Sequence, residues 1–483
     1  MIQRRDLIRY REFIQRVRRY RPSDLLPAIA ATAIRFGEEA AWTADRVRFP
    51  WALAEAAKAS IVAGNEFRNP GVSEVDIIDI CATYNALDDP LVRGTDDDPS
   101  ATVGAFLVRM SHQQFAAQQS VFEEMSRLGA LFDGLDDLDT KVLDSALIER
   151  ILGCTIPEFA GAGFVIAIGA SKNGGFFDPG WQPLWDGPKS INGHFPMRTV
   201  DRVFRDHYLT DFAHFRNVAA RWEQADETLR HHEFNPLVSR PFVVLPDGRY
   251  LAPQPHYAYQ RLGPSALYYA GVESLDAEEV GAFTTDLGLV FQEYVGRQLQ
   301  LLPGATVLPE IFYGNDQRSI DWFVVFDEFV LLVEAKLTRL SHLARMGGDA
   351  LEPDIQRSLG TAFRQVDRTE RLIADGRAEF SEIPMDRPRL GMVVTLEPYW
   401  WANSPFVRRL LPAPILPITV ASIREVEQFV NVACALGTPD VLTDVFADPE
   451  KRLWNLANAL PDGDVPTNPI LQAAWDSYPF RDA

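Results

Sequence analysis

The segment 320–336 constrains the fold of this chain more than any other part of the sequence. Apart from Asp321 near its start and Glu334 and Lys336 at its end, it consists of apolar, mostly aromatic and β-branched residues, and its one polar interruption is the pair Asp327-Glu328. Such runs, divided by turn-forming residues, are typical of β-strands. We therefore expect two antiparallel strands, residues 320–326 and 329–336, joined by a tight turn.

The position of this turn fixes which residues face each other across the hairpin. Counting outward from Asp327-Glu328 by equal steps places Asp321 opposite Glu334. Directly opposed side chains share one face of a sheet, with Cβ atoms roughly 4.5 to 5.5 Å apart. Lys336 lies two residues beyond Glu334 and therefore on the same face. A slip of one residue would destroy this match.

Two carboxylates placed so close repel each other, and we expect a cation between them. Hard oxygen ligands at this separation suit Mg²⁺ or Mn²⁺. Such an ion acidifies a bound water and neutralises charge on a leaving phosphate oxygen. Lys336 would hold or polarise the attacking water, and only six of the 47 basic residues of this chain are lysines. A compact ammonium with a tunable pKa is what arginine cannot supply.

A structural interpretation of the same residues stays open. An acid-x-Lys tripeptide is common, and Asp139-Thr140-Lys141 is a second one in this chain. Glu334 and Lys336 would then form a salt bridge without catalysis, or belong to a nuclease-like fold that has lost activity.

The flanking segments predict the rest of an α/β domain over residues 275–440. A helix begins near Leu275, with Phe283, Leu287, Val290 and Tyr294 on one face. Further strands are expected over 307–314, 389–400 and 415–422, and a second helix over 354–373.

The order of these elements and their polar residues resembles the core of the PD-(D/E)XK, or restriction-endonuclease-like, nuclease superfamily. In that family a helix with an acidic residue precedes a strand bearing Asp, a strand ending in Glu-x-Lys, and a helix that often bears a functional Gln. Asp321 matches the first-strand Asp, and Glu334 with Lys336 matches the signature pair. Glu293 in GLVFQEYVGRQL matches the helical acid, and Gln365 in AFRQVDRTERLI matches the later glutamine.

This resemblance covers about a third of the chain and implies a mixed sheet flanked by helices. It also implies metal-dependent phosphodiester hydrolysis, with Mg²⁺ or Mn²⁺ held by Asp321, Glu334 and Glu293. One departure is that Ile320 rather than Pro precedes Asp321. Glu293, taken alone, is equally consistent with an ordinary solvated helix glutamate.

Arginines in the second helix form one stripe opposite its apolar face. They are Arg357, Arg364, Arg368 and Arg371, and the apolar face carries Leu359, Phe363 and Val366. Such a stripe is usually a solvated face. The functional alternative is a track for nucleic-acid phosphates. The eight arginines before Pro22 allow the same two interpretations, a surface helix or a nucleic-acid arm.

The remaining parts of the chain carry no chemistry that the sequence identifies. Residues 1–150 predict a mainly helical domain, which is the natural place for a protein partner to bind. Residues 151–274 predict a mixed α/β connecting region with a hairpin turning at Pro246-Asp247-Gly248. The glycines at 161, 163 and 169 do not match the dinucleotide fingerprint. Residues 441–483 form a tail without clear signals.

Composition narrows the class of protein. Three distant cysteines and the lack of an apolar leader or membrane span predict a cytoplasmic protein without a membrane partner. A net charge of −20 argues against a protein that coats nucleic acid, but not against an enzyme with a local basic track.

We therefore expect a Mg²⁺-dependent nuclease acting on double-stranded DNA. A role in bacterial restriction or anti-phage defence is suggested by fold analogy alone. The alternative is a non-catalytic binding protein in which the nuclease-like domain serves as a platform. The sequence leaves the oligomeric state open, a homo-oligomer included.

Overall fold

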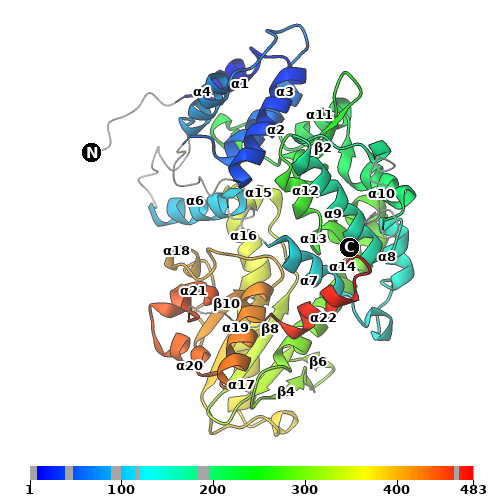
Figure 1. The fold of residues 1–483 in the computed structure, drawn as a ribbon. Coiled ribbons are helices and arrows are strands. Elements are labelled where there is room, and N and C mark those ends of the chain that lie inside the picture. Colours follow the sequence, from blue (N-terminus) through cyan, green and yellow to red (C-terminus); the bar gives the residue numbers. More distant parts are fainter. Residues whose placement is uncertain are drawn as a thin grey trace.

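The computed structural model describes residues 8–38, 47–88, 99–114, 120–181, 195–461 and 467–481. Helices α1 to α4 lie at one end of the molecule and a five-stranded sheet lies at the other (Figure 1). The molecule is mixed α/β, as expected, with a helical N-terminal region and sheet in the C-terminal half. The acidic run at 96–98 and the first arginines of the chain lie outside the described residues.

The N-terminal region packs around one alanine-rich helix. Its helices are α1 (Tyr10–Val17), α2 (Pro22–Glu38), α3 (Pro50–Ala63), α4 (Glu74–Asn85) and α6 (Pro99–Gln114). Positions 52–61 of α3 are all buried, because small side chains let α1, α2 and α4 pack against it on several sides. Mainly helical structure is therefore confirmed for the described part of 1–150.

The middle of the chain is also mostly helical. Its longer helices are α7 (Val121–Leu131), α8 (Ser145–Leu152), α9 (Ile156–Lys172), α10 (Met197–Val203), α11 (Phe212–Ala220), α12 (His256–Gln260) and α13 (Ser265–Ser274). Short helical turns are η3 (Leu135–Asp137), η6 (Phe204–Tyr208), η7 (Glu227–His232) and η8 (Pro236–Val238). A small sheet joins β1 (Leu209–Thr210), β2 (Phe242–Val244) and β3 (Tyr250–Leu251). The hairpin predicted at 246–248 is confirmed, and Gly248 adopts the positive φ of 84° that its turn needs.

The glycine-rich segment of the middle region is a buried helix. In α9, a Cβ at Gly161, Gly163 or Gly169 would collide with an aromatic side chain, so these glycines permit close packing. The stretch Ser145–Lys172 is long and apolar enough to cross a membrane by length and composition, but 56% of its most apolar window is buried inside the protein. Packing in the core accounts for its hydropathy.

The main sheet has the strand order β10-β9-β8-β7-β4. Its strands are β4 (Thr306–Pro309), β7 (Trp322–Val325), β8 (Val330–Lys336), β9 (Arg389–Thr395) and β10 (Ile418–Ser422). Neighbours among β4, β7 and β8 are antiparallel, and β8, β9 and β10 are parallel. Helices α14 (Ala277–Leu299) and α19 (Ile423–Leu436) share a core with one face, and α17 (Thr361–Ala374) shares a core with the other.

Several predicted element boundaries are wrong. The strand expected over 307–314 is divided into β4 and β5 (Phe312–Tyr313), and β5 pairs with β6 (Gln317–Arg318) in a separate hairpin. The helix expected over 354–373 consists of α16 (Leu351–Ile355), a π-helical turn η9 (Gln356–Gly360) and α17. The last two strands are shorter than expected. The remaining elements here are α15 (His342–Arg345), η10 (Ala378–Phe380) and α18 (Pro405–Arg408).

The C-terminal segment is part of the core. It contains α20 (Asp440–Ala447), η11 (Lys451–Leu453), α21 (Leu456–Ala459) and α22 (Pro469–Ser477). Helix α22 packs against α7, and the Tyr478 hydroxyl donates a 2.6 Å hydrogen bond to the Met125 carbonyl. One hydrophobic cluster runs from residue 125 to residue 480 and includes α14 and β7. The predicted boundaries at 150, 274 and 440 stay a prediction.

Candidate active site

The hairpin of β7 and β8 has the predicted register. Trp322 pairs with Val333, and Phe326 donates a 3.0 Å backbone hydrogen bond to Phe329 across the turn. Asp321 immediately precedes Trp322, so this register places Asp321 opposite Glu334. The expected meeting of the two acids across a two-residue turn is confirmed.

The backbone and the lysine hold these two acids in different ways. Oδ2 of Asp321 accepts a 2.7 Å hydrogen bond from the Ala335 amide. Oε1 of Glu334 accepts from Nζ of Lys336, while Oε2 of Glu334 is buried without a hydrogen-bond partner among the described residues. The Glu334 side chain is 1% exposed and that of Lys336 is 21% exposed, so the lysine is the more accessible member of the pair.

Burial and mutual repulsion disfavour ionisation of this acid pair. Burial, and then the charge of Glu334, raises the pKa of Asp321 well above its ordinary value of 3.8. Burial also raises the pKa of Glu334, against the opposing effects of Lys336 and of the Gln365 amide. A cation that contacted both carboxylates would offset both penalties.

Helix α14 carries Glu293 to the edge of this site. The Trp322 indole N–H donates a 2.9 Å hydrogen bond to the Gln292 carbonyl, and the Trp322 ring lies against Gly296, where a Cβ would collide with it. Glu293 is partly buried, and burial raises its pKa, an effect opposed by Arg297.

A further acid, Glu310, lies at the site and was missed by sequence reasoning. Strand β4 pairs Pro309 with Trp322, so the next residue, Glu310, lies opposite Asp321. Glu310 raises the pKa of both Asp321 and Glu293, and it forms a 3.0 Å ion pair with Arg318. Glu310, directly after β4, and Asp321, directly before β7, therefore lie in register with Glu334 of β8. The missing signal was the register of the β4–β7 hairpin, which a single strand over 307–314 obscured.

Helix α17 places Gln365 beside the acid pair. The Ile320 amide donates a 3.2 Å hydrogen bond to the Thr369 hydroxyl, which fastens α17 to the start of β7. Gln365 is partly buried and lowers the pKa of Glu334, and its Oε1 has no hydrogen-bond partner among the described residues.

The arginine stripe faces solvent. Arg357, Arg364, Arg368 and Arg371 are exposed, and Leu359, Phe363 and Val366 are buried on the other side. The stripe is not entirely free, because Arg357 bonds Asp354 at 2.6 Å and Arg368 bonds the Arg318 carbonyl at 2.9 Å. Contact with phosphates stays a prediction for these side chains.

The donors suit an ion that keeps part of its water shell. Within the part of the chain that the structure describes, no group of three or more His, Cys, Asp and Glu side chains is arranged to hold a metal. The triad Asp321, Glu334 and Glu293 does not form such a group. Mg²⁺ is commonly held by one or two carboxylates, with waters and substrate phosphate completing its octahedron. Asp321 and the unpartnered Oε2 of Glu334 fit that role.

No protein-family model matches this chain, and no curated protein matches it.

Proposed function

We propose that this chain is a divalent-metal-dependent nuclease with a restriction-endonuclease-like core. The observation that carries the proposal is the opposition of Asp321 and Glu334 across β7 and β8, with Lys336 in contact with Glu334. The order of elements supports it: helix α14, the antiparallel strands β4, β7 and β8, helix α17, and then β9 parallel to β8. Within this order, α14, β7, β8 and α17 follow the sequence of elements that the family resemblance implies.

Each side chain has a defined task in this proposal. Asp321 and Glu334 would hold Mg²⁺ or Mn²⁺, and Glu293 or Glu310 would assist them. The bound ion supplies a more acidic water and neutralises charge on the phosphate. Nζ of Lys336 orients the attacking water. Hydrolysis then adds water across one P–O bond: its oxygen bonds to phosphorus, and the departing sugar oxygen takes up a proton.

The expected substrate is double-stranded DNA. The net charge of −20 disfavours general affinity for nucleic acid, so binding must depend on a local basic surface. Arg364, Arg368 and Arg371 provide one on α17, the helix that also carries Gln365. Cytoplasmic restriction or defence against phage is the setting that fold analogy suggests.

A second candidate is a non-catalytic binding protein. The direct contact of Lys336 with Glu334 favours it, because this ion pair satisfies one carboxylate oxygen without a metal. In that case the acids would be structural and the N-terminal helices would bind the partner. The two candidates differ in whether a change at Lys336 that preserves folding abolishes DNA cleavage.

Cleavage of supercoiled plasmid in Mg²⁺ tests the proposal. We expect nicking or linearisation that EDTA stops, and Lys336→Ala should lower the rate by about 100-fold or more. Lys141→Ala is the matched control, because Lys141 belongs to the other acid-x-Lys tripeptide and is exposed. Cleavage that is absent, or that ignores both EDTA and Lys336→Ala, would reject the nuclease and favour the binding protein.

A further inference from the structure

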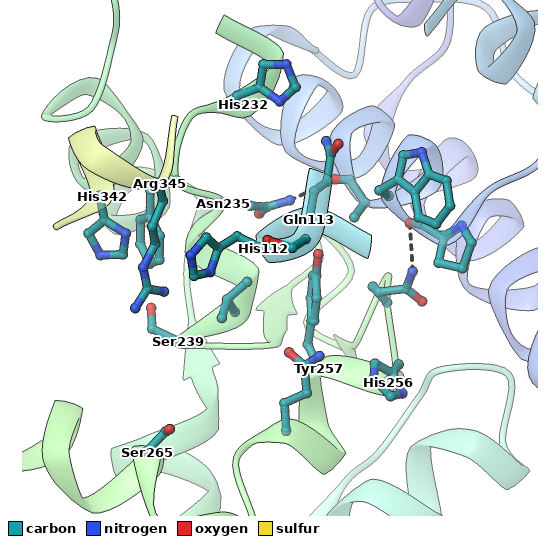
Figure 2. A pocket seen from close by; sticks show the side chains of 18 of the residues that line it. His112, Gln113, His232, Asn235, Ser239, His256, Tyr257, Ser265, His342 and Arg345 are labelled. Carbon is teal, nitrogen blue, oxygen red and sulfur yellow. Dashed lines mark hydrogen bonds between the residues drawn. The ribbon is translucent and has the colours of Figure 1, made fainter. Parts of the chain in front are cut away.

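A cavity of about 300 Å³ lies where the helical region meets the main sheet. Figure 2 shows His112 and Gln113 of α6, Tyr257 of α12, and His342 and Arg345 of α15 around it. The cavity is also lined by Glu397, Pro398 and Trp400, which follow β9, and α15 follows β8. It therefore adjoins the carboxyl ends of two parallel strands, the edge at which open α/β sheets bind ligands.

Among the described residues, one arginine of this cavity, Arg261, forms no ion pair with an acid. Arg261 is only 6% exposed, and its Nε has no hydrogen-bond partner among the described residues. Glu273 raises the pKa of Arg261, but its ion pair is with Arg240, at 3.4 Å. Burial lowers the pKa of Arg261, although a guanidinium stays protonated in proteins. A buried, uncompensated positive charge is costly, and an anion in the cavity would offset that cost.

The carboxylates that line the cavity are already engaged by other cations. Glu397 forms ion pairs with Arg339 at 3.1 Å and Arg345 at 2.8 Å. Glu55 and Glu233 both contact Lys58, at 3.3 and 3.4 Å. None of these three acids is among the main influences on the pKa of Arg261. The positive charge of Arg261 therefore remains for a ligand.

A histidine in the cavity adds an unpartnered hydrogen-bonding group. Nε2 of His112 is buried without a partner among the described residues. Burial, and then the charge of Arg345, lowers the pKa of His112 to about 3. The same causes lower the pKa of His342 to about 4. Both imidazoles are neutral near pH 7 and offer hydrogen bonds rather than charge.

Aromatic side chains form the apolar part of the wall, and they include Trp51, Tyr257, Tyr269 and Trp400. Flat rings of this kind stack on planar ligands. The volume is near the lower end for small-molecule pockets, so it suits one small molecule and excludes a nucleic-acid duplex.

We propose that this cavity binds a small organic phosphate of mononucleotide size. The phosphate contacts Arg261, the neutral imidazoles donate or accept hydrogen bonds, and the planar ring lies against the tyrosines. This site is separate from Asp321 and Glu334, neither of which lines the cavity.

Titration calorimetry on the whole chain, without added metal, tests the proposal. The probes are the four common nucleoside 5′-monophosphates, with adenosine and inorganic phosphate as comparisons. We expect at least one monophosphate to bind tenfold or more tightly than both comparisons. Failure of all four to bind, or binding no tighter than that of adenosine or of inorganic phosphate, would overturn it.

Variants locate the bound phosphate. Arg261→Gln should weaken the best monophosphate at least tenfold, Arg261→Lys should restore part of the loss, and Arg198→Gln, at an exposed position outside the cavity, should change nothing. If Arg261→Gln does not fold, His112→Ala should weaken binding instead. If folded variants bind the best monophosphate as tightly as the unchanged chain does, the assignment of the cavity as its binding site would be wrong. Lys336→Ala should bind normally, so the outcome does not depend on the nuclease.

Discussion

At the scale of single residues, the distinguishing feature of the site is a pair of buried acids whose ionisation is unfavourable. Asp321 and Glu334 are opposed acids whose pKa values are raised by burial. The charge of Lys336 opposes this rise for both acids, but its hydrogen bond is to one oxygen of Glu334. A divalent ion held by both carboxylates would offset this penalty.

Asp321→Asn should separate these roles. We expect the metal-free chain to become more stable by about 1 kcal/mol, because repulsion is removed and the amide oxygen can still accept from Ala335. Mg²⁺ should no longer stabilise the variant. Urea unfolding with and without Mg²⁺ measures both effects, and Asp327→Asn in the exposed turn is the control. Equal stabilisation of both variants by Mg²⁺ would place the ion elsewhere.

The same acids predict how stability depends on pH. A carboxyl whose pKa is raised on folding makes the folded protein less stable as pH rises. The loss begins near the pKa of the unfolded chain, 3.8 for Asp321 and 4.5 for Glu334, and continues up to the pKa of the folded state. Mg²⁺ binds the ionised form, so its stabilising effect should grow as pH rises. Thermal unfolding at pH 5 and pH 8, with and without Mg²⁺, measures this difference. A larger effect at pH 5 would contradict the assignment.

At the scale of elements, the contact between α14 and β7 sets the position of Glu293. Gly296→Val should cost about 1 to 3 kcal/mol by overpacking against Trp322, and it should slow cleavage by displacing the helix. Gly288→Ala is the control on the same helix, since a Cβ there has no neighbour within 4 Å. Chemical unfolding and the plasmid assay provide the two readouts. Unchanged cleavage in Gly296→Val would contradict a role for Glu293 in cleavage.

The hairpin could be predicted because its register depends on local information. Two apolar runs separated by one polar turn were enough to predict that Asp321 and Glu334 face each other. Glu310 was missed because the β4–β7 pairing spans the extra hairpin of β5 and β6, whose turn contains Asp316 with a positive φ of 55°. The π-helical turn before α17 was also missed, because such turns are rare and the apolar spacing of this segment is that of one continuous helix.

At the scale of the whole molecule, distant segments share one interior. Arg127 of α7 forms a buried 2.6 Å ion pair with Glu427 of α19, and Tyr294 of α14 donates to the same glutamate at 2.7 Å. The cavity likewise takes its walls from the N-terminal helices, the middle region and the segments that follow β8 and β9. Sequence patterns could not reveal this, since each contact joins residues far apart in the chain.

A fragment spanning 275–440 tests how far the predicted nuclease domain is independent. We expect it to aggregate, because it lacks α7, α9 and α22, whose residues share the α14 core. Size-exclusion chromatography and urea unfolding, compared with the whole chain, measure this. A monomeric fragment that unfolds cooperatively would support the predicted boundaries instead.

The most direct test of the account is an anomalous difference map from a crystal grown with Mn²⁺. If Asp321 and Glu334 hold the metal, a peak is expected between their carboxylates, within reach of Lys336, and it should be lost in Asp321→Asn. Absence of that peak at a Mn²⁺ concentration that supports cleavage, or its persistence in the variant, would contradict the account.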